Sequence, residues 1–160
     1  MDMTDGRALG DPGTAAFRLE KYPFYLLNRA VSRYNVIIGG RLRSIGLDIP
    51  TWRVLMILGE QAPRSIGQIA EAAVINLSTM MRIIQRMEQA GLVTSAANAA
   101  DARVTDVHLG ETGTAKLAEA RQVTAPVYAG LIAGFSRQEF DRFVATMNKL
   151  QANLDAMSRR

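Results

Sequence analysis

The sequence predicts a mainly α-helical protein in which long helices near both ends flank a lobe that closes with a β-hairpin. Three observations predict this class. Apolar residues recur at steps of three and four through most of the 160 residues, the period of an amphipathic helix. Capping residues and glycines divide this pattern into separate helices. One stretch, 92–109, has instead the pattern of two short strands joined by a polar loop.

The first elements follow from local signals. Residues 1–20 hold turn residues without an apolar period and are predicted to form a flexible tail. A long amphipathic helix begins near Phe24, and Gly46 ends it. Asp48 is placed to cap the next helix, which is predicted over 49–60.

The middle of the chain has the strongest boundary signals. Ser65 and Gln68 form a capping-box pattern that opens a short helix over 66–72. A tight turn then leads to a second helix over 77–90, which Gly91 stops. The only β signal follows directly, and its alternation predicts that His108 points away from the inner face of the hairpin.

Two long helices complete the chain. Thr112 is predicted to cap the first of them, which runs to about Gly134 with a kink at Pro126. Ser136 to Glu139 form a second capping box. The last helix then runs to about Met157, and its apolar residues are spaced 4, 3, 4, 3, as in a coiled-coil seam.

Composition excludes several classes of protein. No apolar run reaches the roughly 18 residues that a membrane span needs. The start of the chain also lacks the basic-then-apolar pattern of a signal peptide. These features argue against a secreted or membrane-spanning protein and predict a cytoplasmic one.

Metal and redox chemistry are disfavoured by the lack of suitable ligands. The chain has no cysteine and one histidine, which excludes thiolate sites, cysteine nucleophiles and thiol-based sensing. It also lacks a Gly-rich phosphate loop and any nucleophile–base pair. We therefore predict no enzyme, no metal and no cofactor. A helical enzyme built on scattered Asp and Glu is the alternative.

The basic charge suggests a polyanionic partner. The net charge is +4, and 16 of the 19 basic residues are Arg, whose guanidinium forks suit phosphates and guanine edges. An Ala- and Arg-rich genome would give the same composition, so the charge does not identify the partner.

The order of elements over 65–109 is that of a winged helix-turn-helix: short helix, turn, second helix, hairpin. The second helix is apolar on one side and polar on the other. A helix inserted in a DNA major groove needs this division. The solvated face of an ordinary surface helix is the alternative, but the hairpin and the long flanking helices favour DNA. The polar residues of this helix are Ser78, Thr79, Arg82, Gln85 and Arg86.

These segments together resemble the MarR family of bacterial transcription regulators over about 24–157. The order and spacing of the pieces carry the resemblance, since no single piece is specific. The matching stretches are Gly46-Leu47, Trp52-Arg53-Val54-Leu55, Ser65 to Ala70, Ser78 to Ile84, Met87 to Val93, Asp101-Ala102-Arg103 and Val107 to Gly113.

The resemblance implies a homodimer in which the first and last helices of both subunits interlock. It implies recognition helices in successive major grooves of a pseudo-palindrome, with half-sites roughly 34 Å apart. The corresponding regions are a tail (1–20), a dimerisation region (21–47 and 112–160) and a DNA-binding lobe (48–111).

Family positions also imply individual DNA-binding roles. Arg82 resembles the recognition-helix arginine, and Arg103 the wing arginine that enters the minor groove beside an ion-paired Asp101. Ser78 and Thr79 are placed to cap the helix or to meet phosphate. The wing tip, 96–100, carries no positive charge, which predicts weaker nonspecific binding than in typical members. The full predicted set is Ser65, Ser78, Thr79, Arg82, Gln85, Arg86, Asp101 and Arg103.

The resemblance further implies repression that a small organic effector relieves. An aromatic wall with one guanidinium would suit an aromatic carboxylate or its coenzyme A thioester. Core packing of Trp52 and a salt bridge of Arg29 are the alternatives for those residues. A constitutive regulator and a winged-helix module that binds protein are the alternative functions. The predicted effector residues are Tyr25, Asn28, Arg29, Trp52, Arg53 and Tyr128.

Overall fold

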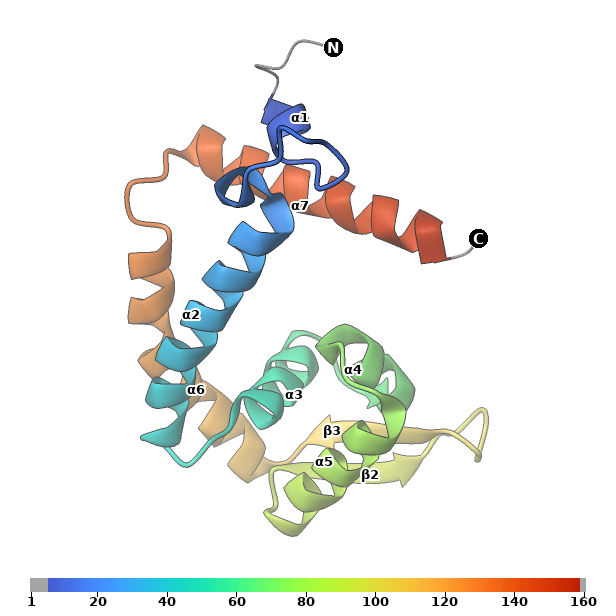
Figure 1. The fold of residues 1–160 in the computed structure, drawn as a ribbon. Helices are drawn as coiled ribbons and strands as arrows, with labels where there is room; N and C mark the ends of the chain where they lie inside the picture. The colour runs from blue at the N-terminus through green and yellow to red at the C-terminus, as the bar shows by residue number, and fades with distance from the viewer. Residues whose placement is uncertain (1–5, 159–160) are drawn as a thin grey trace. The chain divides into compact units, whose positions relative to one another are not determined.

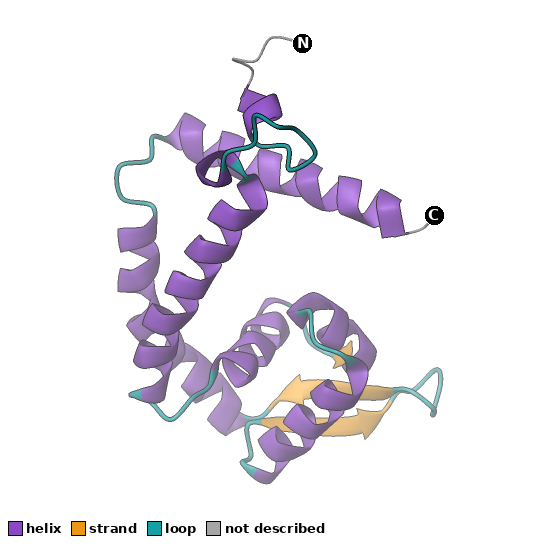
Figure 2. Ribbon diagram, in the orientation of Figure 1, coloured by secondary structure: helices purple, strands orange, loops and turns teal. Residues whose placement is uncertain are grey.

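The computed structural model describes residues 6–158, which are mostly helical with one small antiparallel sheet (Figures 1 and 2). The predicted fold class is confirmed. In chain order the elements are α1 (Gly6–Leu9), η1 (Leu19–Lys21), α2 (Pro23–Arg43), α3 (Ile49–Glu60), β1 (Arg64–Ser65), α4 (Ile66–Ala73), α5 (Leu77–Gln89), β2 (Val93–Ala97), β3 (Thr105–Leu109), α6 (Glu111–Leu131) and α7 (Arg137–Ser158).

The predicted caps of three helices are confirmed. Asp48 precedes α3, and its Oδ1 accepts the Thr51 backbone N–H at 2.8 Å. Ser65 and Gln68 form the reciprocal capping box of α4. Ser136 opens α7 in the same way, since its backbone N–H donates to Glu139 at 2.8 Å. Each cap satisfies N–H groups that the first helical turn leaves unpaired.

Two cap predictions were wrong. The N-cap of α5 is Asn76, whose Oδ1 accepts the Thr79 backbone N–H at 2.8 Å. The predicted caps, Ser78 and Thr79, lie inside the helix. Thr112 is not the cap of α6, which begins one residue earlier, directly after β3. The Gly110 carbonyl accepts the Thr114 N–H at 2.9 Å, so the helix starts as soon as the strand ends.

The sheet has the order β1-β3-β2, and both pairs are antiparallel. The hairpin of β2 and β3 is confirmed, with Val93 opposite Leu109 and Ala97 opposite Thr105. The prediction that this hairpin is the only β structure was wrong. β1 is two residues long, too short to show an alternating pattern, and it exists by pairing with β3.

The core of the winged lobe, defined as α3 to β3, lies between its helices and the sheet. Leu55, Ile69, Met80 and Val107 are all fully buried there. His108 is exposed beside buried Val107, as the alternation predicts. This core fixes one side of α5 against the lobe and leaves the opposite side free to meet a partner.

The chain divides into two compact units, one up to Thr124 and one from Ala125. The boundary falls inside α6, two residues before Pro126. In the segment predicted to be a tail, residues 6–20 form α1, turns and the start of η1, while residues 1–5 lie outside the described range. The predicted domain limits and the kink stay predictions. Within 6–158, no helix combines the length and apolarity that crossing a membrane requires.

Candidate nucleic-acid interface

The helix α5 divides its residues between the core and the solvent. Its inner side is completely buried, with Met80, Ile84 and Met87 at 2% exposure or less. Its outer side carries Arg82 and Gln85, both exposed. The packing therefore holds the helix by one face and presents the other, as the sequence predicts.

Arg82 and Gln85 are available on this outer face, which also carries the acidic Glu88. Within residues 6–158, neither side chain has a hydrogen bond or an ion pair. Both line an open groove of about 600 Å³ between α5 and the wing strands. Ser95 of β2 and Thr105 of β3 lie on its other side. An amide and a guanidinium in such a groove can bind base edges and phosphates.

The predicted hydroxyl residues have local roles in the structure. The Ser65 hydroxyl accepts the Gln68 N–H at 3.2 Å within the capping box. The Ser78 hydroxyl donates to the Asn76 side chain at 2.9 Å. Thr79 is exposed on the first turn of α5. Phosphate contacts by these three residues stay predictions.

Arg86 differs from Arg82 and Gln85 on the same helix, because its side chain is paired with residues of α3 and its N-cap. Its Nη2 donates to Asp48 Oδ2 at 2.8 Å and to Thr51 Oγ1 at 3.0 Å. Burial raises the pKa of Asp48, but hydrogen bonds from Thr51 and the charge of Arg86 outweigh burial and lower the pKa below its usual value. Sequence reasoning missed this pair, whose members lie 38 residues apart.

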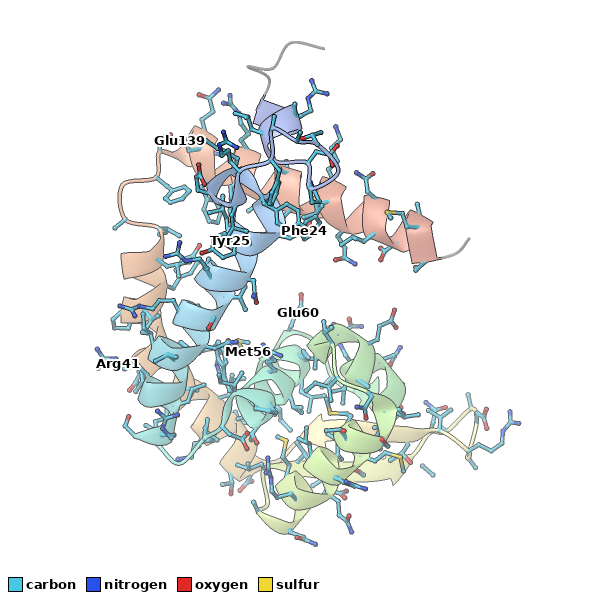
Figure 3. The ribbon with its side chains drawn as sticks, viewed as in Figure 1. Phe24, Tyr25, Arg41, Met56, Glu60 and Glu139 are labelled. Atoms are coloured by element: carbon cyan, nitrogen blue, oxygen red, sulfur yellow. The ribbon has the colours of Figure 1, made fainter. Side chains whose placement is uncertain are left out.

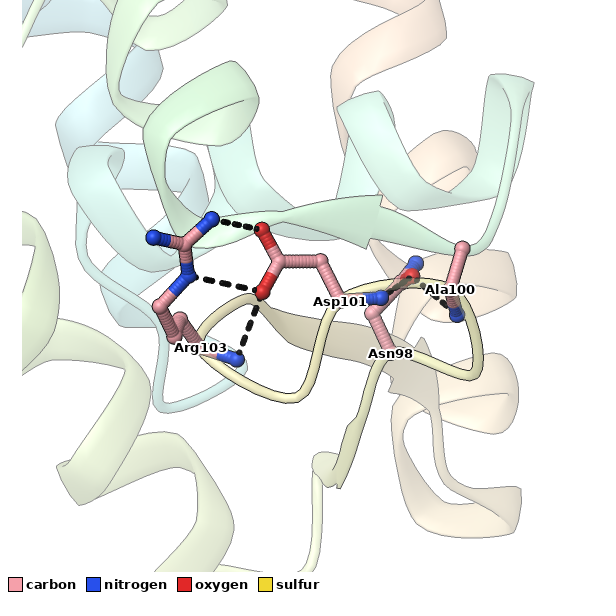
Figure 4. A network of polar contacts seen from close by, with 4 residues as sticks. All are labelled: Asn98, Ala100, Asp101 and Arg103. Carbon is pink, nitrogen blue, oxygen red and sulfur yellow. Dashed lines mark hydrogen bonds and ion pairs between the residues drawn. The ribbon is translucent and has the colours of Figure 1, made fainter.

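The wing arginine is held by the ion pair that the family resemblance implies (Figure 4). Arg103 Nη2 and Nε each donate to an Asp101 carboxylate oxygen at 2.9 Å. These bonds lower the pKa of Asp101 and raise that of Arg103. Asn98 organises the same loop, since its Oδ1 accepts the Asp101 N–H and its Nδ2 donates to Asp106. The ion pair thus restrains the Arg103 guanidinium, although the side chain stays 90% exposed.

We expect Asp101→Ala to lower the affinity for a specific duplex about fivefold, because Arg103 would lose this restraint. The loss should occur although the change removes a negative charge close to a polyanion. Fluorescence anisotropy with a labelled duplex measures it. Asp141→Ala, which removes an exposed carboxylate from α7, is the matched control. Equal or tighter binding of Asp101→Ala would contradict the positioning role of the ion pair.

The six predicted effector residues lie on α2, α3 and α6, and five of them belong to the first unit. Trp52 is buried at 7% exposure, which supports its core-packing alternative. Arg53 is half-buried and donates to the Ala73 carbonyl at 3.5 Å. Tyr128 is 54% exposed and belongs to the second unit.

Three of the six lie on one helix. Tyr25 lies near the start of α2 (Figure 3). Arg29 follows one turn later, and its guanidinium lies 5.4 Å from the centroid of the Tyr25 ring. Arg29 and Asn28 also line an open hollow of about 910 Å³ along α2, together with Ser32 and Arg33. The two guanidinium groups at this hollow can pair with a carboxylate.

Metal ligands do not gather in the part of the chain that the structure covers. Among residues 6–158, no group of three or more Asp, Glu or His side chains is arranged to hold an ion.

Comparison with known proteins gives consistent matches. A model described as the MarR family matches residues 45–104. The HTH-type transcriptional repressor IacR of Pseudomonas putida is 34% identical over 152 residues, which cover 95% of this chain and 91% of that protein.

Solved structures of the same kind are similar to this fold. A MarR-family transcriptional regulator from Silicibacter pomeroyi has a TM-score of 0.77 and 30% identity, covering 85% of this chain and 92% of that one. BpsR of Bordetella bronchiseptica, whose DNA binding is regulated by 6-hydroxynicotinic acid, has a TM-score of 0.75 and 22% identity. The match covers 84% of this chain and 96% of BpsR. At this lower identity the likeness shows the fold alone.

Proposed function

This chain belongs to the MarR family of transcription regulators, and on that premise we propose that a small organic effector releases it from a pseudo-palindromic operator. It is a DNA-binding transcriptional repressor and not an enzyme. The observation that supports operator reading best is that Arg82 and Gln85 are exposed and unpaired on α5, in the same lobe as the ion-paired wing arginine. Arg82 and Gln85 would read base edges in the major groove, and Arg103 would enter the adjacent minor groove.

A homodimer would supply the two recognition helices that a pseudo-palindrome needs. Large apolar side chains stay exposed on both long helices predicted to interlock. On α2 these include Val36 at 70% exposure, and on α7 Met157 at 69%. Burying them against a second copy would remove apolar surface from water on both chains. Their exposure in the single chain supports the dimer.

The effector is proposed to be an aromatic carboxylate or its coenzyme A thioester. Arg29 supplies a cation at the hollow on α2, and the Tyr25 ring lies against that guanidinium, a combination that suits a planar anion. In BpsR, an aromatic acid regulates DNA binding on the same fold. Such an effector weakens DNA binding only by its preference for the conformation that does not fit the operator.

Selection of duplexes from a random library tests this proposal. We expect the selected sequences to contain two inverted half-sites about one helical turn apart. A panel of aromatic acids and their coenzyme A thioesters is then added to the protein–duplex complex. We expect at least one member to release the DNA.

The outcomes separate the alternative functions. Selection of a palindrome that no compound releases would favour a constitutive regulator. If the library yields no enriched sequence, the proposed operator reading is wrong, and a module that binds protein becomes the better explanation.

A further inference from the structure

We infer that Arg86 is a positioning residue, which fixes the recognition helix against the start of α3, rather than a contact to DNA. This inference deepens the proposed function and rests on it. It departs from the family-based expectation, which placed Arg86 with Arg82 among the DNA contacts. The geometry of the single chain points to it through three features of the contact between α3 and α5.

The first feature is the number of partners. One guanidinium nitrogen of Arg86 donates to two acceptors, Asp48 Oδ2 at 2.8 Å and Thr51 Oγ1 at 3.0 Å. By contrast, Arg82, one turn earlier on α5, has no intramolecular hydrogen bond or ion pair within residues 6–158. The two arginines of the same helix therefore have different surroundings.

The second feature is the burial of an acceptor. Thr51 is only 5% exposed, and it is the polar residue in the core of the winged lobe. If Arg86 turned away to a phosphate, the buried Thr51 hydroxyl would lose this hydrogen bond. Losing a hydrogen bond to a buried hydroxyl is unfavourable, so this acceptor favours retention of the contact, although the Arg86 side chain itself is 57% exposed.

The third feature is the place of the contact in the chain. Asp48 both caps α3 through the Thr51 N–H and accepts from Arg86. It follows Gly46 and Leu47, the short connection from α2. Arg86 thus joins the last turns of α5 to the point where the first long helix enters the winged lobe. The contact sets the position of α5 relative to that entry.

Two variants and their combination test the inference. Asp48→Ser keeps a good N-cap residue but removes the carboxylate that pairs with Arg86. Arg86→Gln keeps the aliphatic stem and removes the guanidinium. Binding to the duplex selected above is measured by anisotropy over a range of salt concentrations. The melting temperature and hydrogen exchange of α5 are measured on the same samples. Asp141→Ser on α7 is the control for loss of a carboxylate.

If Arg86 is a positioning residue, Asp48→Ser and Arg86→Gln should weaken duplex binding in the same way. We expect each single variant to bind the duplex about three- to tenfold more weakly and the double variant to bind no more weakly than the worse single. We expect the salt slope to stay that of the wild type, since no phosphate contact is lost. Amides of α5 should exchange faster in both variants without DNA.

If Arg86 instead contacts DNA, Asp48→Ser should not weaken duplex binding. Asp48→Ser would then leave affinity unchanged or raise it, because a negative charge is removed and Arg86 is freed. Arg86→Gln would lower the salt slope by about 0.9 for each copy. Either result overturns the inference. The inference is also overturned if both variants melt at a lower temperature but bind the duplex with wild-type affinity, because the ion pair would then contribute to stability alone. A wild type that selects no duplex overturns the proposed function, and this inference with it.

Discussion

Arg82→Ala is expected to bind its selected duplex at least about 30-fold more weakly than the wild type. A bidentate arginine–guanine contact contributes about 1–3 kcal/mol, and a dimer would lose two of them. The loss should be confined to the specific sequence, and discrimination against other duplexes should fall with it. Arg82 is exposed, and within residues 6–158 its side chain makes no hydrogen bond, so the fold should not change.

Anisotropy with specific and random duplexes measures this effect. Arg142→Ala, which removes an exposed arginine from α7, is the matched control and should bind normally. A melting temperature equal to that of the wild type would show that the loss is not unfolding. If Arg82→Ala discriminates between the specific and random duplexes as well as the wild type does, Arg82 does not read the operator sequence.

Gly113→Ala is expected to destabilise the protein by about 3 kcal/mol or more. Gly113 lies buried in the first turn of α6, and a Cβ there would collide with the Leu92 carbonyl oxygen at the start of β2. The atoms that it meets are backbone and the position of a Cβ is set by the backbone, so a rotamer change cannot relieve the collision. For a chain of this size the melting temperature should fall by roughly 6–12 °C.

Gly130→Ala provides a matched control in the same helix. A Cβ at Gly130 meets nothing within 4 Å, so this variant should melt at or slightly above the wild-type temperature. Both variants are compared at one protein concentration, because dimer stability depends on it. If Gly113→Ala has the melting temperature of the wild type, α6 does not approach the Leu92 backbone as closely as the structure shows.

Most of the fold could be predicted because its signals are local. Helical periodicity located α2 and α7, and capping residues such as Ser65 and Ser136 located helix starts. Asn76 was missed although it stands directly before α5, since the hydroxyls of Ser78 and Thr79 offered competing caps. β1 could not be found, because pairing with a strand more than 40 residues away creates it.

The candidate site was predicted in part for the same reason. The exposed face of α5 follows from helical spacing, so Arg82 and Gln85 could be assigned to it. The pairing of Arg86 with Asp48 depends on tertiary packing, which the spacing does not show. The effector residues were the least predictable, since a buried core aromatic such as Trp52 and an aromatic that lines a ligand site look alike in one sequence.

The most direct test of DNA recognition is the salt dependence of binding to the DNA immediately upstream of the protein's own gene. Contacts of the protein with DNA phosphates would release condensed counterions, which predicts a negative log–log slope of about −0.9 for each phosphate contacted. We expect tight binding with this slope. Absence of binding even at low salt, or binding with a slope near zero, would contradict recognition of DNA through α5 and the wing.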